Sequence, residues 1–232
     1  MDNRTKTVPF FKDSSIEQES LKLLQSYGLE IGKKIETPVP VFDIIEYLGY
    51  DIDFRNDGIY EDDNILGGLL ISEKKVEINE NLSSQEGRMN FTAAHEIGHI
   101  VLHVPLSTEN SAEDSSNIIC RKDQGFEGMK KEPREWQADK FAAYLLMPTV
   151  MVKKAFFRIH KRPANVKKKS ILEMIFSISA KQKGRRLAEK VIQVGHFENV
   201  SKMAMMNRLI GLGLIKGLPF QKTLQMKNKK GE

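Results

Sequence analysis

Cysteine, tryptophan and long apolar runs are scarce in this chain of 232 residues. Cys120 is the single cysteine, so no disulfide can form within the chain, which is typical of a protein in a reducing compartment. No stretch approaches the roughly 18 uncharged apolar residues of a membrane-spanning helix. The first residues are polar, and no apolar signal core follows them. We therefore expect a cytoplasmic protein.

Histidine is also scarce, but its distribution is uneven. Three of the five histidines, His95, His99 and His103, lie in one short segment. His95, Glu96 and His99 form the pattern H-E-x-x-H, in which a helix carries two zinc ligands and a catalytic carboxylate. Residues four apart lie on one helix face, about 6 Å apart along the axis, so two imidazoles can converge on one ion. Glu96 can then reach a water on that ion without being a ligand itself.

The residues around this pattern predict a largely buried helix. Apolar side chains recur there at helical spacing: Phe91, Ala94, Ile97, Ile100 and Val101. A core helix with structurally satisfied histidines is the alternative interpretation. His103 continues the spacing of four, but it lies about 12 Å from His95 along the helix, too far to share one ion. We interpret His103 as structural.

A second candidate cluster lies on a helix predicted over 133–148, which begins and ends near a proline. Glu135 and Asp139 are four residues apart and therefore share a face. A catalytic zinc site needs a third protein ligand, an open fourth position, and acceptors that orient the ligand imidazoles through the free ring N–H. Glu135 is the candidate ligand and Asp139 the candidate acceptor, and an ordinary solvated face is the alternative. Should Glu135 not bind, Glu132 or an acid in 109–127 is the next candidate.

Strands precede the predicted metal-binding helix and helices dominate after it, an order that indicates an α+β fold. The elements predicted before it are helices over 15–34 and 41–48 and strands over 50–54, 65–71 and 76–79. We expect one strand of the 65–79 region to form the edge of a substrate cleft, where it could pair with an extended peptide.

The chain turns polar between the two candidate segments. Residues 106–132 predict a loop that covers the cleft, and a solvated linker is an equally good interpretation. Cys120 lies inside this stretch. We expect an inert surface or packing cysteine, with a thiol that masks the metal as the alternative.

The excess positive charge, +5 for the whole chain, is concentrated in the last third. Helices are predicted there over 171–178, 187–194 and 203–214. The pattern V-S-x-x-A-x-x-x-R-L resembles a helix-turn-helix whose second helix begins near Ser201, a favoured N-cap residue type. The basic side chains could contact phosphates, but we prefer a solvated face or a docking surface for an acidic partner. His160 and His196 are candidates for stabilising an oxyanion, although no motif places them near the metal.

The sequences N-F-T-A-A-H-E-I-G-H-I-V-L-H and E-W-Q-A-D-K-F-A-A-Y-L-L-M-P carry a resemblance to a known family. They resemble the ImmA/IrrE metallopeptidases, and the likeness covers roughly residues 36–216. The resemblance implies an intracellular, gluzincin-like zinc enzyme, with Glu96 as general base and three ligands: His95, His99 and Glu135. Characterised members cleave Cro/CI-type helix-turn-helix repressors. Gln137 is a departure, since members often carry a second glutamate there.

These observations predict a zinc-dependent endopeptidase that cleaves a Cro/CI-type repressor at one site and thereby derepresses its genes. One zinc ion per chain is expected, with manganese as the alternative metal, and no membrane partner. The predicted units are an N-terminal helical extension (1–34), a zincin-like metallopeptidase domain with a small sheet and the H-E-x-x-H helix (35–150), a basic helix-turn-helix-like unit (151–216) and a flexible tail (217–232).

The alternative function is a non-catalytic regulator that binds a repressor or DNA and uses the zinc fold as a scaffold. The intact H-E-x-x-H pattern argues against it, because a scaffold has no need for Glu96. Direct DNA binding is therefore the less favoured partner prediction, and a protein substrate is the favoured one.

Overall fold

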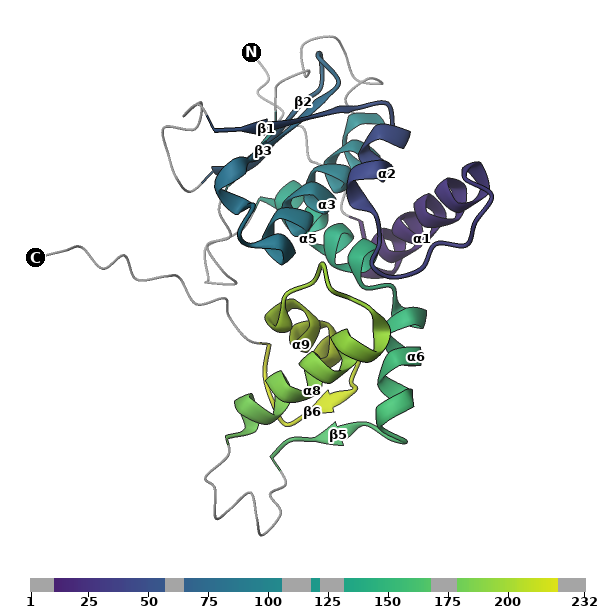
Figure 1. Cartoon of the computed structure of the whole chain (residues 1–232), viewed down its shortest axis with the longest axis vertical. Helices are drawn as coiled ribbons and strands as arrows, with labels where there is room; N and C mark the ends of the chain where they lie inside the picture. Colours follow the sequence, from purple (N-terminus) through teal and green to yellow (C-terminus); the bar gives the residue numbers. More distant parts are fainter. Residues whose placement is uncertain (1–10, 57–64, 106–117, 122–131, 168–178, 221–232) are drawn as a thin grey trace, which may run out of the picture.

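The computed structural model describes residues 11–56, 65–105, 118–121, 132–167 and 179–220. It has a small mixed sheet at one end, with helices α3 and α5 beside it and helix α1 at the flank (Figure 1). Three further helices, α6, α8 and α9, lie at the other end (Figure 1). The predicted α+β class is confirmed.

The main sheet has four strands in the order β1-β3-β2-β4. Their bounds are Asp51–Arg55 for β1, Ile65–Leu70 for β2, Lys75–Asn79 for β3 and Ile118–Arg121 for β4. β1 runs parallel to β3, and the pairs β2–β3 and β2–β4 are antiparallel. The three strands predicted from alternation are thus confirmed to within a residue or two. A fourth strand was not predicted.

The prediction that a strand of the 65–79 region forms the cleft edge is wrong. Both strands of that region, β2 and β3, are paired on two sides. Among the described strands, β1 and β4 form the two edges. β4 lies inside the stretch predicted as a loop, and its position explains the error, because it covers the side of β2 that would otherwise be open. The rest of the predicted loop at 106–132, apart from Glu132 at its end, lies outside the described residues.

The helices of this half agree closely with the sequence prediction. They are α1 (Asp13–Glu30), α2 (Val41–Tyr47), α3 (Glu86–Leu102) and α5 (Pro133–Leu146), with a short 3-10 turn η1 at Glu80–Leu82. Pro133 stands in the first turn of α5, where its missing N–H costs nothing. Apart from Met89, Phe91, Val101 and the residues of its first turn, α3 is buried, because it packs on both the sheet and α5.

The helices α3 and α5 are in close contact where Gly98 faces Ala138. A Cβ atom built on Gly98 would lie 3.0 Å from the Ala138 Cα and 3.1 Å from its carbonyl oxygen. Both are backbone atoms of a helix, so they cannot rotate away as a side chain would. The absence of a side chain at position 98 therefore sets how near α5 can lie to the two histidines of α3.

The C-terminal helices are α6 (Thr149–Ile159), α8 (Ala180–Gly195) and α9 (Lys202–Gly211), with a two-residue parallel pairing of β5 (Ala164–Asn165) and β6 (Ile215–Lys216). Ser201 caps α9, since its hydroxyl accepts a hydrogen bond from the backbone N–H of Ala204. Helix α6 was not predicted, and the helix predicted over 171–178 lies outside the described residues.

Arg208 of α9 connects the C-terminal helices to the rest of the molecule. Its guanidinium donates to the carboxylate of Glu17 on α1 at 2.9 Å and to the carbonyl of Met147 at 3.0 Å. It also lies over the ring of Tyr144, 4.5 Å from the ring centroid. Because these partners come from α1, from α5 and from the residue after α5, one buried side chain fixes α9 against all of them.

No helix in the described parts of the chain is both long enough and apolar enough to span a bilayer. The division into units at 34, 150 and 216 stays a prediction, and α1 is closely joined to its neighbours by the packing of Ile16, Leu23 and Leu24 into the common core.

Replacing Gly98 with alanine should lower the free energy of unfolding by about 1–3 kcal/mol, because the new methyl group presses on the α5 backbone. The matched control is Gly211→Ala at the end of α9, where the new Cβ meets only the Phe220 ring at 3.4 Å or more. That variant should be neutral or slightly stabilised, because alanine has the higher helix propensity. Chemical denaturation of both variants measures the difference, and equal stability of the two would contradict the close-packing argument.

Candidate metal centre

Three potential metal ligands from two helices converge at one point. His95 and His99 come from successive turns of α3, and Glu135 comes from the first turn of α5. The potential ligand atoms of the three side chains all lie within 4.8 Å of one another. Both imidazoles are buried, whereas the Glu135 side chain is 26% exposed, so Glu135 is the part of the cluster that contacts solvent.

The separations between these atoms fit a tetrahedral zinc site. Ligands at about 2.0–2.1 Å from a tetrahedral ion are about 3.3–3.4 Å from one another. His95 Nε2 and His99 Nε2 are 3.0 Å apart. Each of them lies 3.3 Å from an oxygen of Glu135. Three protein ligands leave the fourth position of such an ion for water or substrate, which is the arrangement of catalytic rather than structural zinc sites.

Asp139 supports the first histidine. Its Oδ1 lies 2.9 Å from His95 Nδ1, so the imidazole can donate its N–H to the carboxylate. That hydrogen bond places the proton on Nδ1 and leaves the lone pair of Nε2 directed at the ligand cluster.

A longer chain of hydrogen bonds supports the second histidine. His99 Nδ1 lies 2.9 Å from His103 Nδ1, and His103 Nε2 lies 3.1 Å from Gln137 Oε1. The amide oxygen of Gln137 can only accept, so His103 donates from Nε2 and can accept from His99 at Nδ1. The His99 proton is then on Nδ1, and Nε2 keeps its lone pair. His99, His103 and Gln137 can thus all be neutral while the Nε2 atom of His99 points at the other two candidate ligands.

The electrostatics of the cluster favour the protonation states that bind a metal. Burial lowers the pKa of His99, and burial followed by the nearby His99 lowers the pKa of His103 to about 4, so both rings are neutral near pH 7. Burial alone would raise the pKa of Glu135, but the adjacent His95 and His99 rings hold the pKa of this carboxyl well below its usual range. Neutral imidazoles and an ionised carboxylate are the forms that ligate divalent metals.

Glu96 follows His95 on α3 and is fully buried. It is not one of the three groups whose atoms converge. The other sequence candidates lie elsewhere: Glu132 is the exposed N-cap of α5, His160 stacks on Phe156, and His196 lies beside Glu198 at the end of α8.

The sequence interpretation missed the contribution of His103 and Gln137. We interpreted His103 as structural because it is too far from His95 to share an ion, and that distance argument holds. The spacing of four from His99 was nevertheless a signal for a hydrogen bond between the two rings. No pattern within either helix could show that Gln137, 34 positions away, completes the chain.

Substitution of any converging side chain should remove the metal. We expect close to one divalent ion per chain in the purified protein, and a strong loss of retention in His95→Ala, His99→Ala and Glu135→Ala, because each removes a ligand atom. Glu96→Gln should keep the ion. Elemental analysis after dialysis measures retention. Full retention of the ion by Glu135→Ala would show that another acidic residue is the third ligand.

The hydrogen-bond chain behind His99 predicts a graded effect. Gln137→Leu removes the acceptor for His103 at similar volume and should weaken metal affinity by about 10–100-fold. Gln137→Glu restores an acceptor oxygen and should recover most of that loss. Competition with a chromophoric chelator measures affinity, and thermal unfolding of the metal-free proteins serves as the control for folding. Equal affinities in Gln137→Leu and the wild type would show that the chain does not support the ligand.

The resemblance noted from the sequence is confirmed by comparison with family models. The model of the IrrE N-terminal-like domain, among the M78 peptidases, matches residues 56–208, which is well over half of the chain. A search of curated proteins finds no match. The matched residues include both histidines of α3 and Glu135 of α5, the three groups that converge. The chain therefore belongs to the IrrE-like M78 metallopeptidase family.

Proposed function

We propose that the protein is an intracellular zinc endopeptidase that cuts a helix-turn-helix repressor of the Cro/CI type at one site. The observation that carries this proposal is the convergence of His95, His99 and Glu135 at tetrahedral separations, with Glu96 next to the first ligand. A structural zinc site would use four protein ligands, whereas three such groups cluster among the described residues.

The proposed reaction assigns a role to each residue of the centre. His95, His99 and Glu135 would hold the zinc ion, which when bound would supply Lewis-acid chemistry to the water and the scissile carbonyl. Glu96 accepts the proton of the attacking water and gives it to the amine nitrogen as the peptide C–N bond breaks. Asp139 orients His95, and the pair His103–Gln137 orients His99, so the ligand rings are held before substrate arrives.

In fold terms we propose a zincin-like catalytic unit, followed by a helix-turn-helix-like unit built on α8 and α9. The sheet packed on the H-E-x-x-H helix supports the first assignment. For substrate binding, β4 is the better edge strand: it pairs with β2 on one side only among the described strands, and it contacts α3. An extended segment of the substrate could add to this edge through backbone hydrogen bonds.

The alternative function, a regulator that binds DNA or a repressor without cutting, gains little support from α9. Its two cationic side chains are engaged within the protein: Lys202 pairs with Glu189, and Arg208 pairs with Glu17. A recognition helix reads DNA with polar side chains that reach the base edges and phosphates. We therefore propose that the basic C-terminal unit positions a protein partner rather than DNA.

Incubation with candidate repressors tests the proposed function. We expect one cut, giving two fragments whose masses sum to that of the repressor plus one water, with little activity on casein. The Glu96→Gln enzyme should be slower by about 10²–10⁴-fold, because it lacks the general base but keeps the metal ligands. Intact-mass spectrometry over time measures both rates.

Three outcomes would contradict the proposal in different ways. Metal-dependent digestion of many unrelated proteins would support peptidase activity but contradict the proposed specificity for one repressor. Equal cleavage rates for Glu96→Gln and the wild type would show that Glu96 is not the general base. A Glu96→Gln protein that regulates its genes as well as the wild type, with no cut in any repressor, would favour the non-catalytic alternative.

A further inference from the structure

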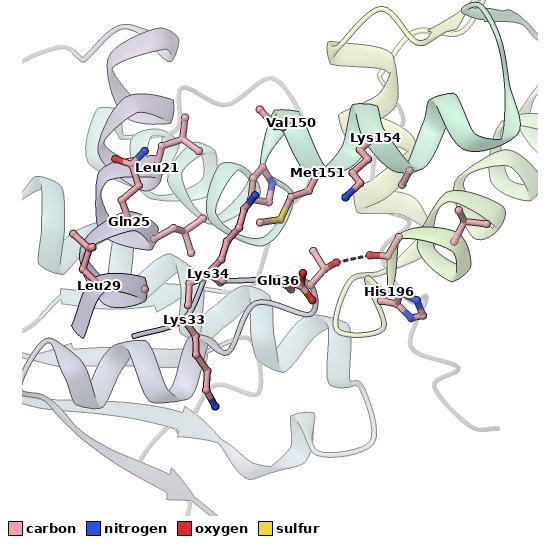
Figure 2. Close-up of a pocket in the computed structure, with 18 of the residues that line it drawn as sticks. Leu21, Gln25, Leu29, Lys33, Lys34, Glu36, Val150, Met151, Lys154 and His196 are labelled. Atoms are coloured by element: carbon pink, nitrogen blue, oxygen red, sulfur yellow. Dashed lines mark hydrogen bonds between the residues drawn. The ribbon is translucent and has the colours of Figure 1, made fainter. Parts of the chain in front are cut away.

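A large open cavity lies apart from the candidate metal centre. It is bounded by α1, the segment 32–37, α6 and the end of α8 (Figure 2). Its volume is about 1110 Å³. Small-ligand sites typically measure about 300–1,000 Å³ and enclose most of their ligand. None of the described residues that line this cavity belongs to the metal centre, so it is a separate feature, which we call the α1–α6 trough.

Two helices form the walls of the α1–α6 trough. Each contributes a row of side chains spaced by four: Leu21, Gln25 and Leu29 from α1, and Val150, Lys154 and Arg158 from α6. Residues four apart stack on one helix face, so each row is about 12 Å long, or about two helical turns. Figure 2 shows Leu21, Gln25 and Leu29 in line along one wall. Each wall is therefore as long as about two turns of a bound helix.

The rims of the trough expose apolar surface. Leu29 is 83% exposed and Val150 is 71% exposed, the two highest values among the large apolar side chains described. Single exposed apolar side chains are ordinary on protein surfaces. Here the two most exposed ones flank the same cavity from different helices, which is the arrangement expected where a partner covers them.

The charge of the lining is one-sided. Lys33, Lys34, Lys154 and Arg158 line the trough, against a single acidic residue, Glu36. All four cationic residues are exposed. Within the described parts of the chain, no ion pair engages Lys33, Lys34 or Lys154. An occupant that carried acidic side chains would therefore find cations on the 33–34 segment and on α6.

We propose that the α1–α6 trough binds a helical segment of a protein partner that has apolar side chains on one face and acidic side chains beside them. A helix laid in a groove uses apolar anchors at spacings of three and four, and Leu21 and Leu29 of α1 with Val150 of α6 offer apolar contacts to such anchors. The last twelve residues of this chain carry four lysines and one glutamate, so they share the charge of the rim and are not the matching occupant. This binding site stands independently of the proposed peptidase activity.

Fluorescence anisotropy with a designed probe tests the proposal. The probe is a stapled, fluorescein-labelled peptide of about 14 residues, with leucines at every third or fourth position and glutamates beside them. The full-length Glu96→Gln protein is used so that the probe is not cut. We expect Lys154→Glu to weaken binding about three- to tenfold. The double variant Leu29→Asp, Val150→Asp should weaken it by at least about tenfold.

Matched controls separate the trough from other basic surfaces. Lys153→Glu changes the neighbouring exposed lysine of α6, which does not line the trough, and should leave affinity within about twofold. Arg186→Glu, in a separate basic hollow beside α8, should have as little effect. Binding that is lost on metal chelation would place the probe at the metal centre. Two results would contradict the charge argument: equal effects of Lys153→Glu and Lys154→Glu, or equal binding of a probe that has lysines in place of its glutamates. Tighter binding of dodecanoate, a fatty-acid anion, than of the peptide would show that the trough takes a small apolar ligand and would also overturn the proposal.

Discussion

The metal centre depends on how closely two helices can approach. The H-E-x-x-H helix supplies two imidazoles by its own geometry, but α5 supplies the third candidate ligand, Glu135, and both terminal hydrogen-bond acceptors, Asp139 and Gln137. A Cβ at position 98 would already crowd the α5 backbone, so the contact between Gly98 and Ala138 stands at the limit of helix packing. Glu135 reaches the histidines from one turn of α5 away from that contact. The metal-binding geometry is therefore a property of the helix pair, and no part of α3 alone contains it.

The two ligand histidines are supported unequally, and this affects the charge of the centre. A carboxylate stands behind His95, whereas a neutral imidazole and a neutral amide stand behind His99. Glu135 is held in its ionised form, Asp139 stands behind His95, and the buried Glu96 adds a third carboxyl group beside the first histidine. A carboxylate at position 137 would supply the same acceptor oxygen but would add a further negative charge to this buried position. The amide oxygen keeps the acceptor function without that charge.

Local patterns predicted much of this fold, and their limits are physical. The bounds of α2, β1, β2 and β3 followed from periodicity, prolines and turn residues, since these signals act over a few residues. β4 could not be recognised in the same way, because four residues in a polar stretch become a strand only by pairing with β2. The strand order depends on pairing between residues far apart in the sequence. Local patterns could not show it, and the wrong prediction of the cleft edge followed from this. At the site, the spacing of four found His95 and His99 and suggested the pair Glu135 and Asp139. The partnership of His103 with Gln137 joins two helices, so no single-helix pattern contains it.

A metal centre of this kind has little means of selecting its substrate. Its buried groups act on the carbonyl, the water and the leaving nitrogen, which every peptide bond shares. Under the proposed function, selectivity must therefore come from surfaces that contact the partner away from the scissile bond. Edge pairing along β4 would use the backbone and so favours an extended segment of almost any sequence. The α1–α6 trough offers what the backbone cannot: two exposed apolar side chains, Leu29 and Val150, and four cationic side chains on α6 and the segment after α1. Because those elements pack on the same core that holds α5, a partner seated there would be held at a fixed position relative to the metal ligands.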